Sequence, residues 1–255
     1  MPHSTQTSQR RRLHVLQLYP RDMNIYGDYG NALVLKQRIQ WYGYQPVMHS
    51  YDPGDEFPEQ VDLLIGGGGQ DSGQGRIHLD LLTIGSRIHS LAESGTPMLA
   101  VCGLYQLFGH YFQPRSGERL DGLGLLDVTT YGTDNRLIGN VVARSAEFGE
   151  IIGYENHSGQ TYLGSSAQPL AQVIKGEGNN DRDDHEGARQ HNVLGSYLHG
   201  ALLPKNPAIA DFLIGTAVQK QYGEPLGELQ APVTAPQPLA ELTERARATA
   251  AARPR

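Results

Sequence analysis

The sequence predicts an α/β fold, a three-layer sandwich in which a mostly parallel central sheet lies between two layers of helices, with an antiparallel extension. The first 112 residues alternate short apolar runs with longer segments of helical periodicity, which is the pattern of strand–helix units. From about residue 120 to 200, short strand-like runs and glycine-rich turns follow one another instead. With 38% hydrophobic and 19% charged residues, the chain of 255 residues can form a core.

Three strand–helix units are expected in the first half. Each strand is a short apolar run, typical of a strand buried on both faces. Each helix has apolar residues three and four apart, which places them on one face. We expect Asp28 to cap the start of the first helix and Gly43 to close it. The expected elements are a strand at 13–18, a helix between 28 and 43, a strand at 61–65, a helix at 76–94, a strand at 98–102 and a helix at 103–110.

The second half is expected to supply the antiparallel strands and one last core helix. The short strands are predicted at 125–130, 137–143, 150–154, 162–163, 170–174 and 193–197, and the helix at 207–222. These boundaries divide the chain into a disordered N-terminus at 1–12, one domain at 13–222 and a flexible Pro/Ala-rich tail at 223–255, whose end is weakly helical.

A densely charged loop at 176–191 allows two interpretations. Asp181, Asp183, Asp184 and His185 are possible metal ligands, but their spacing fits no standard calcium or zinc loop. A solvated hairpin tip is the favoured interpretation, and no metal site is predicted.

Composition excludes several classes of protein. There are 21 Lys and Arg against 27 Asp and Glu, a net charge of −6, whereas nucleic-acid binders usually carry a basic patch. A single cysteine excludes a disulfide framework and a four-cysteine zinc site. No apolar run reaches the roughly 18 residues of a membrane span, and the apolar stretch after Arg10-Arg11-Arg12 is too short for an export signal. We therefore expect a cytoplasmic protein.

The strongest local signal for chemistry surrounds Cys102. An apolar strand delivers this residue to the first turn of a predicted helix, and Gly103 supplies the small residue that a sharp turn needs. A helix start stabilises a thiolate, and its free N–H groups can hold an oxyanion. A lone cysteine is also commonly a small core residue, so the segment by itself leaves both interpretations open.

A thiol nucleophile needs a base, usually histidine. His199 ends a late apolar strand and is followed by glycine, which directs it toward the crevice where ligands bind in parallel sheets. His157, in a polar turn, is the rival, and a structural role is favoured for it. The four glycines at 66–69 follow a strand and lack the Gly-Lys-Ser/Thr of a phosphate loop. Half of an oxyanion hole opposite Cys102 suits them better.

These segments together resemble class I glutamine amidotransferases of the cobyric-acid-synthase type. The anchors are the glycine run 66–69, the elbow 101–106 and Tyr197-Leu198-His199-Gly200, and the resemblance spans roughly residues 13–222. A finer match, at 18–20, 23–31, 67–71, 134–140 and 154–157, resembles the glutaminase subunits of lipid II isoglutaminyl synthases. The resemblance implies a flavodoxin-like, class I amidotransferase fold.

The resemblance also implies roles for individual residues. Cys102 would attack the side-chain amide of L-glutamine to form a thioester, and His199 would move the protons. The N–H groups of Gly103 and of one glycine of the run, Gly68, would stabilise the oxyanion. Arg136 would bind the α-carboxylate, which a guanidinium pairs with bidentately. We expect Gln106 to contact the amino-acid backbone of the substrate.

A partner is implied as well. The chain has no Walker A motif, so ATP and magnesium are expected on a Mur-ligase-like subunit (MurT type) of a heterodimer. That subunit would activate the D-glutamate α-carboxyl of lipid II for amidation. Many class I members place an acid two residues after the histidine, but Ala201 stands there. Either Glu155 or an acid of the partner would then orient His199, and glutaminase activity of the isolated chain should be low.

Two other hypotheses remain open from the sequence. One is a stand-alone Cys–His hydrolase of γ-glutamyl compounds on the same sheet. The other is a non-catalytic binding subunit that kept the fold. The presence of both Cys102 and His199 disfavours the binding subunit, and Arg136 favours free glutamine over a peptide.

Overall fold

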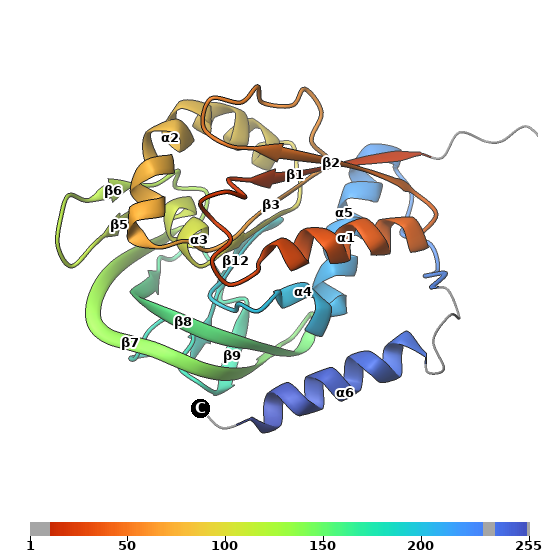
Figure 1. Cartoon of the computed structure of the whole chain (residues 1–255). Coiled ribbons are helices and arrows are strands. Elements are labelled where there is room, and N and C mark those ends of the chain that lie inside the picture. The colour runs from red at the N-terminus through yellow and green to blue at the C-terminus, as the bar shows by residue number, and fades with distance from the viewer. Residues whose placement is uncertain (1–10, 232–237, 254–255) are drawn as a thin grey trace, which may run out of the picture.

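The computed structural model describes residues 11–231 and 238–253, and its centre is a six-stranded sheet (Figure 1). Five neighbouring strands are parallel, and only the edge strand β11 is antiparallel. In spatial order the strands are β11 (Ala188–Gln190), β12 (Val193–Ser196), β4 (Met98–Val101), β3 (Leu63–Gly66), β1 (Arg12–Leu18) and β2 (Gln45–Tyr51).

Helices cover both faces of this sheet (Figure 1). On one face α1 (Tyr29–Trp41) packs against α5 (Pro207–Tyr222), and the single turn α4 (Leu202–Lys205) lies beside them. On the other face α2 (Asp71–Glu93) packs against α3 (Gly103–Phe108). The central strands β3 and β4 are buried along their whole length, as expected for a sheet covered on both faces. The three-layer α/β sandwich predicted from the sequence is confirmed.

Most of the antiparallel strands form a second sheet, and only β11 extends the first one. The long hairpin of β7 (Val128–Ser145) and β8 (Gly149–Leu163) dominates it. Smaller strands complete it: β5 (Tyr111–Gln113), β6 (Leu120–Asp121), β9 (Ala171–Lys175) and β10 (His185–Glu186). The hairpin contacts the segment that follows β12 of the central sheet. There Tyr154 of β8 pairs with His199, whose N–H donates to the Tyr154 carbonyl at 2.7 Å.

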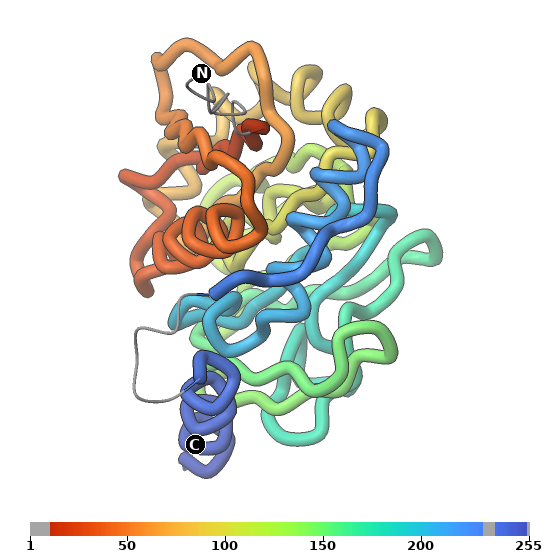
Figure 2. Tube along the Cα trace, turned by 90° about the vertical axis from the view of Figure 1, so that its right-hand side faces the viewer, coloured from red at the N-terminus to blue at the C-terminus, as the bar shows by residue number. Residues whose placement is uncertain are grey.

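Several elements differ from the sequence-based expectation, and the short elements β5, β6, β10, β11 and α4 were not predicted. Strand β2 was not predicted, and α2 begins at Asp71 rather than at Arg76. The predicted N-terminal segment 1–12 lies mostly outside the described residues, but Arg12 already begins β1. The helical end predicted for the tail is present as α6 (Leu239–Ala252), which lies against α4, β7 and β8 (Figure 2). Among the described residues, no helix combines the length and apolar character needed to cross a bilayer.

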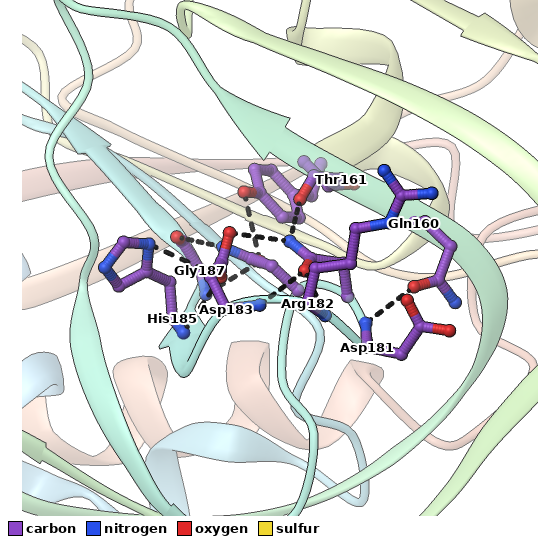
Figure 3. Close-up of polar contacts among 10 residues, drawn as sticks. Gln160, Thr161, Asp181, Arg182, Asp183, His185 and Gly187 are labelled. Carbon is purple, nitrogen blue, oxygen red and sulfur yellow. Dashed lines mark hydrogen bonds and ion pairs between the residues drawn. The ribbon is translucent and has the colours of Figure 1, made fainter.

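Hydrogen bonds to Gln160 and Thr161 hold the charged loop at 176–191 to β8, so it is more than a solvated hairpin tip (Figure 3). Asn180 is fully buried; its Oδ1 accepts the N–H of Asp183, and its Nδ2 donates to the Thr161 carbonyl. Nearby, the N–H of Asp181 donates to Gln160 Oε1 at 2.8 Å. In the part of the chain that the structure describes, no three His, Cys, Asp or Glu side chains are grouped to hold a metal ion.

Candidate active site

Four segments meet where the parallel strands of the central sheet end. The loop 19–28 follows β1, the glycine run 66–69 follows β3, Cys102 follows β4, and His199 lies three residues after the end of β12. The carboxyl ends of parallel strands share one edge of a sheet, and ligands of α/β proteins bind there. The topology therefore brings these distant segments together.

Cys102 occupies the sharp turn predicted from the sequence. Its backbone has φ 50° and ψ −108°, a strained conformation for a residue other than glycine. The turn is held by the Cys102 N–H, which donates to the Ser196 carbonyl at 2.8 Å, and by the Gln106 N–H, which donates to the Cys102 carbonyl at 3.0 Å. The turn connects β4 directly to α3, which is nucleophile-elbow geometry.

His199 lies next to Cys102, with Gly68 beside both. A methyl group placed on Gly68 would lie 2.5 Å from His199 Cε1 and 3.3 Å from Cys102 Sγ. His199 is fully buried, and Cys102 is 6% exposed. The two side chains that the sequence suggested as nucleophile and base therefore meet at one point, although 97 positions separate them in the chain.

Asp28 provides the acid that the sequence analysis did not find. Its Oδ2 lies 3.3 Å from His199 Nδ1 and accepts the N–H of Gly68 at 2.8 Å. Asp28 precedes α1, but its side chain makes no capping hydrogen bond, so the predicted capping role is wrong. Glu155 does not orient the base either: its carboxylate accepts the N–H groups of Glu177 and Gly178. The reason for expecting low activity of the isolated chain is thereby removed.

The surroundings favour a charged His199. Burial by itself would lower its pKa, but the electrostatic interaction with Cys102 and the hydrogen bond with Asp28 raise the pKa to about 10. Among the described residues, His199 Nε2 has no hydrogen-bond partner. One ring nitrogen is thus oriented by a carboxylate, and the other remains available for proton transfer.

The glycine run lies beside Cys102, and its N–H groups differ in their partners. The N–H of Gly68 is engaged by Asp28 Oδ2 at 2.8 Å. The nitrogen of Gly69 lies 3.2 Å from the position that a Cβ on Gly103 would occupy. Gly69, not Gly68, lines the cavity together with Cys102. The N–H groups of Gly69 and Gly103 are therefore the pair that this geometry favours.

A cavity of about 370 Å³ contains Cys102 at one side and Arg136 at another. Arg136 Nε donates to Asn156 Oδ1 at 2.8 Å, and its Nη2 donates to the Tyr26 hydroxyl at 3.2 Å. Neither of these acceptors is a carboxylate, so the guanidinium can still pair with the carboxylate of a ligand. A larger groove, about 650 Å³, lies beneath α6, but it is not lined by Cys102 or Arg136.

Gln106 lies in a network of buried side chains next to Cys102. Its Oε1 accepts from Gln74 Nε2 at 2.7 Å, and its Nε2 donates to the Tyr197 hydroxyl at 3.0 Å. Gln74 also donates to the Gly103 carbonyl at 3.0 Å. These bonds hold the Gln106 side chain beside the start of α3, and Gln106 also lines the cavity that contains Cys102, so its contact with a substrate stays a prediction.

His157 lines the same cavity but is held as a neutral ring. Its Nδ1 lies 2.8 Å from the Gly159 carbonyl, which assigns the proton to Nδ1, and its ring stacks on Tyr197 at 3.6 Å. Burial lowers its pKa to about 3. This environment agrees with the structural role that the sequence analysis favoured over a role as the base.

Comparison with known proteins gives related sequences over most of the chain. A model of the CobB/CobQ-like glutamine amidotransferase domain matches residues 14–207. The protein named lipid II isoglutaminyl synthase (glutamine-hydrolyzing) subunit GatD of Streptococcus pneumoniae is 38% identical over 216 residues, 84% of this chain and 83% of that one. The GatD subunit of Staphylococcus aureus is 38% identical over 214 residues, 82% of this chain and 87% of that one.

Solved structures support the fold. A crystal structure of a glutamine amidotransferase has a TM-score of 0.57 at 17% identity and covers 80% of this chain and 98% of that one. A second glutamine amidotransferase structure, from Thermotoga maritima, has a TM-score of 0.53 at 13% identity and covers 93% of this chain and 92% of that one. The class I amidotransferase fold expected from the sequence is confirmed.

Proposed function

The chain belongs to the CobB/CobQ-like glutamine amidotransferase family, and from this premise we propose that it hydrolyses L-glutamine and supplies the ammonia that amidates lipid II. The observation that carries the proposal is the meeting of Cys102, His199 and Asp28 beside a cavity that also contains Arg136. The 38% identity to subunits named for glutamine-hydrolysing lipid II isoglutaminyl synthase supports the choice of acceptor.

The proposed reaction uses these residues in two steps. Arg136 binds the α-carboxylate, and the Cys102 thiolate attacks the side-chain carbonyl carbon of glutamine. The N–H groups of Gly69 and Gly103 stabilise the oxyanion that forms. His199, protonated and oriented by Asp28, gives its proton to the departing nitrogen, and ammonia leaves with a γ-glutamyl thioester on Cys102.

Water completes the cycle. His199, now neutral, removes a proton from a water molecule that attacks the thioester carbonyl. The C–S bond breaks, glutamate leaves, and the proton stays on His199, which restores the thiolate–imidazolium pair. A buried carboxylate beside Nδ1 keeps the ring in the tautomer that this exchange requires.

We propose that the amidation itself takes place on a Mur-ligase-like partner (MurT type) in a heterodimer. Forming an amide from a carboxylate needs activation, and this sequence has no Walker A motif. ATP and magnesium would bind to the partner, which activates the α-carboxyl of D-glutamate in the lipid II stem peptide. The ammonia released at Cys102 then produces D-isoglutamine.

The test measures glutamate release from glutamine by the chain alone and with a co-expressed Mur-ligase-like protein. Wild type should turn over, Cys102→Ala should be inactive, and Arg136→Ala should raise the KM. Loss of a charge-assisted carboxylate contact is expected to raise KM about 10- to 100-fold. Lipid II amidation should require both proteins, ATP and glutamine. Faster cleavage of γ-glutamyl peptides than of glutamine would instead identify a stand-alone hydrolase.

A further inference from the structure

Tyr26 lies between the two halves of the site and touches both. Its ring centroid is 4.5 Å from that of His199, at an interplanar angle of 58°. Its hydroxyl accepts a hydrogen bond from Arg136 Nη2 at 3.2 Å. It also lines the cavity that contains Cys102. One side chain thus contacts the proposed base and the proposed carboxylate-binding group.

The loop that carries Tyr26 is tied to the glycine run. The Ile25 N–H donates to the Gly68 carbonyl at 3.1 Å, and the Gly68 N–H donates to Asp28 Oδ2 at 2.8 Å. Anchors therefore lie one residue before and two residues after Tyr26. These two hydrogen bonds hold the loop on either side of Tyr26 against Gly68, which itself lies beside His199.

The hydroxyl and the ring have separate physical effects. Arg136 is held at Nε by Asn156 and at Nη2 by Tyr26, and two fixed contacts define the plane of its guanidinium. A defined plane is required for bidentate pairing with a carboxylate. The ring covers His199, whose side chain is 0% exposed. Excluding water there strengthens the attraction of His199 to the Cys102 thiolate and to Asp28.

We propose that Tyr26 is a positioning residue with two separable tasks, holding Arg136 for the α-carboxylate of the substrate and shielding His199 from water. The inference rests on the proposed glutaminase function and adds a determinant of substrate specificity. Holding Arg136 favours the binding of substrates that carry a free α-carboxylate. The second task acts on the chemical step for any substrate.

Two substitutions separate the tasks. Tyr26→Phe keeps the ring and removes the hydroxyl, so KM for glutamine should rise about three- to tenfold with kcat within about twofold, as expected for the loss of one hydrogen bond near 1 kcal/mol. Tyr26→Leu removes both, so kcat should also fall about tenfold, and the pKa of His199 measured by imidazole NMR should move. Tyr29→Phe and Tyr29→Leu are matched controls, because Tyr29 is 48% exposed and is not among the residues lining the cavity.

A substrate without the carboxylate provides the decisive comparison. With 4-aminobutanamide, Tyr26→Phe should equal wild type in kcat/KM, whereas Tyr26→Leu should remain impaired. The inference is overturned if Tyr26→Phe leaves KM for glutamine unchanged, or if it lowers kcat as much as Tyr26→Leu does. Should Tyr26→Leu unfold, the Tyr26→Phe comparison on the two substrates decides alone. Absence of turnover by wild type would refute the proposed function instead, and the NMR measurement on His199 would still test the shielding.

Discussion

Replacing Asp28 by asparagine removes the charge that faces His199 and leaves the side-chain shape almost unchanged. In the native chain one oxygen, Oδ2, serves both His199 Nδ1 at 3.3 Å and the Gly68 N–H at 2.8 Å. The amide of asparagine keeps an acceptor for Gly68, so the glycine run should stay in place. The loss is then confined to the orientation of His199 and the stabilisation of its protonated form.

The expected magnitude follows from the geometry. A hydrogen bond to a charged group contributes about 1.5–3 kcal/mol, and solvent does not weaken this one, because the two side chains are 0% and 2% exposed. The 3.3 Å separation is long for a hydrogen bond, which places the value near the lower end. A loss of about 1.5–2 kcal/mol corresponds to a kcat about 10- to 30-fold lower.

The assay is steady-state glutamate release by purified Asp28→Asn, with imidazole NMR on the same sample. The pKa of His199 should fall, because the hydrogen bond with Asp28 is one of the contacts that raise it. Asp211→Asn is the matched control: it breaks the ion pair with Arg38, outside the cavity, and should cost stability without lowering kcat. A folded Asp28→Asn protein with kcat within twofold of wild type would refute the assignment of Asp28 as the group that orients the base.

Three further predictions concern packing and pH. Gly68→Ala places a methyl group 2.5 Å from His199 and should lower kcat at least tenfold. The control Gly75→Ala, in α2, places its methyl group with no atom within 4 Å, so it should keep activity and raise the free energy of unfolding by about 0.5–1 kcal/mol. Equal kcat values for the two variants would contradict the prediction for Gly68. The pKa of His199 is raised from 6.5 to about 10, so its contribution to the free energy of unfolding is present below pH 6.5 and is lost as pH rises through about 10. Denaturation curves at several pH values should show this decrease in the free energy of unfolding, and Cys102→Ala should make the decrease smaller. The pKa of His157 is lowered to about 3, so its contribution is present above pH 6.5 and lost as pH falls toward 3, and His157→Gln should reduce acid sensitivity over that interval.

The strands and helices that carry the site could be predicted because their signals are local. An apolar strand ends at Cys102, glycine follows, and the next turn has helical spacing. Helix α5 was predicted with its observed limits, 207–222, between Pro207 and Gly223. Strand β2 was missed because it is an edge strand with mixed polar residues and a proline, so only Tyr51 is buried.

The contacts between distant segments could not be predicted. Asp28 has the sequence appearance of a helix cap, and nothing local shows that its carboxylate turns away from its helix toward Gly68 and His199. Gln106 follows the nucleophile by four residues, and nothing local shows that its amide bonds to buried Gln74 and Tyr197. These outcomes depend on which loops the sheet order brings together.

The most direct test of the account is covalent trapping of the nucleophile with 6-diazo-5-oxo-norleucine, a reactive analogue of glutamine, followed by peptide mass spectrometry. The account predicts one adduct, on Cys102, formed at a rate that falls in Arg136→Ala and Asp28→Asn and is suppressed by excess glutamine. Label on another residue, or ammonia release that survives Cys102→Ala, would contradict it.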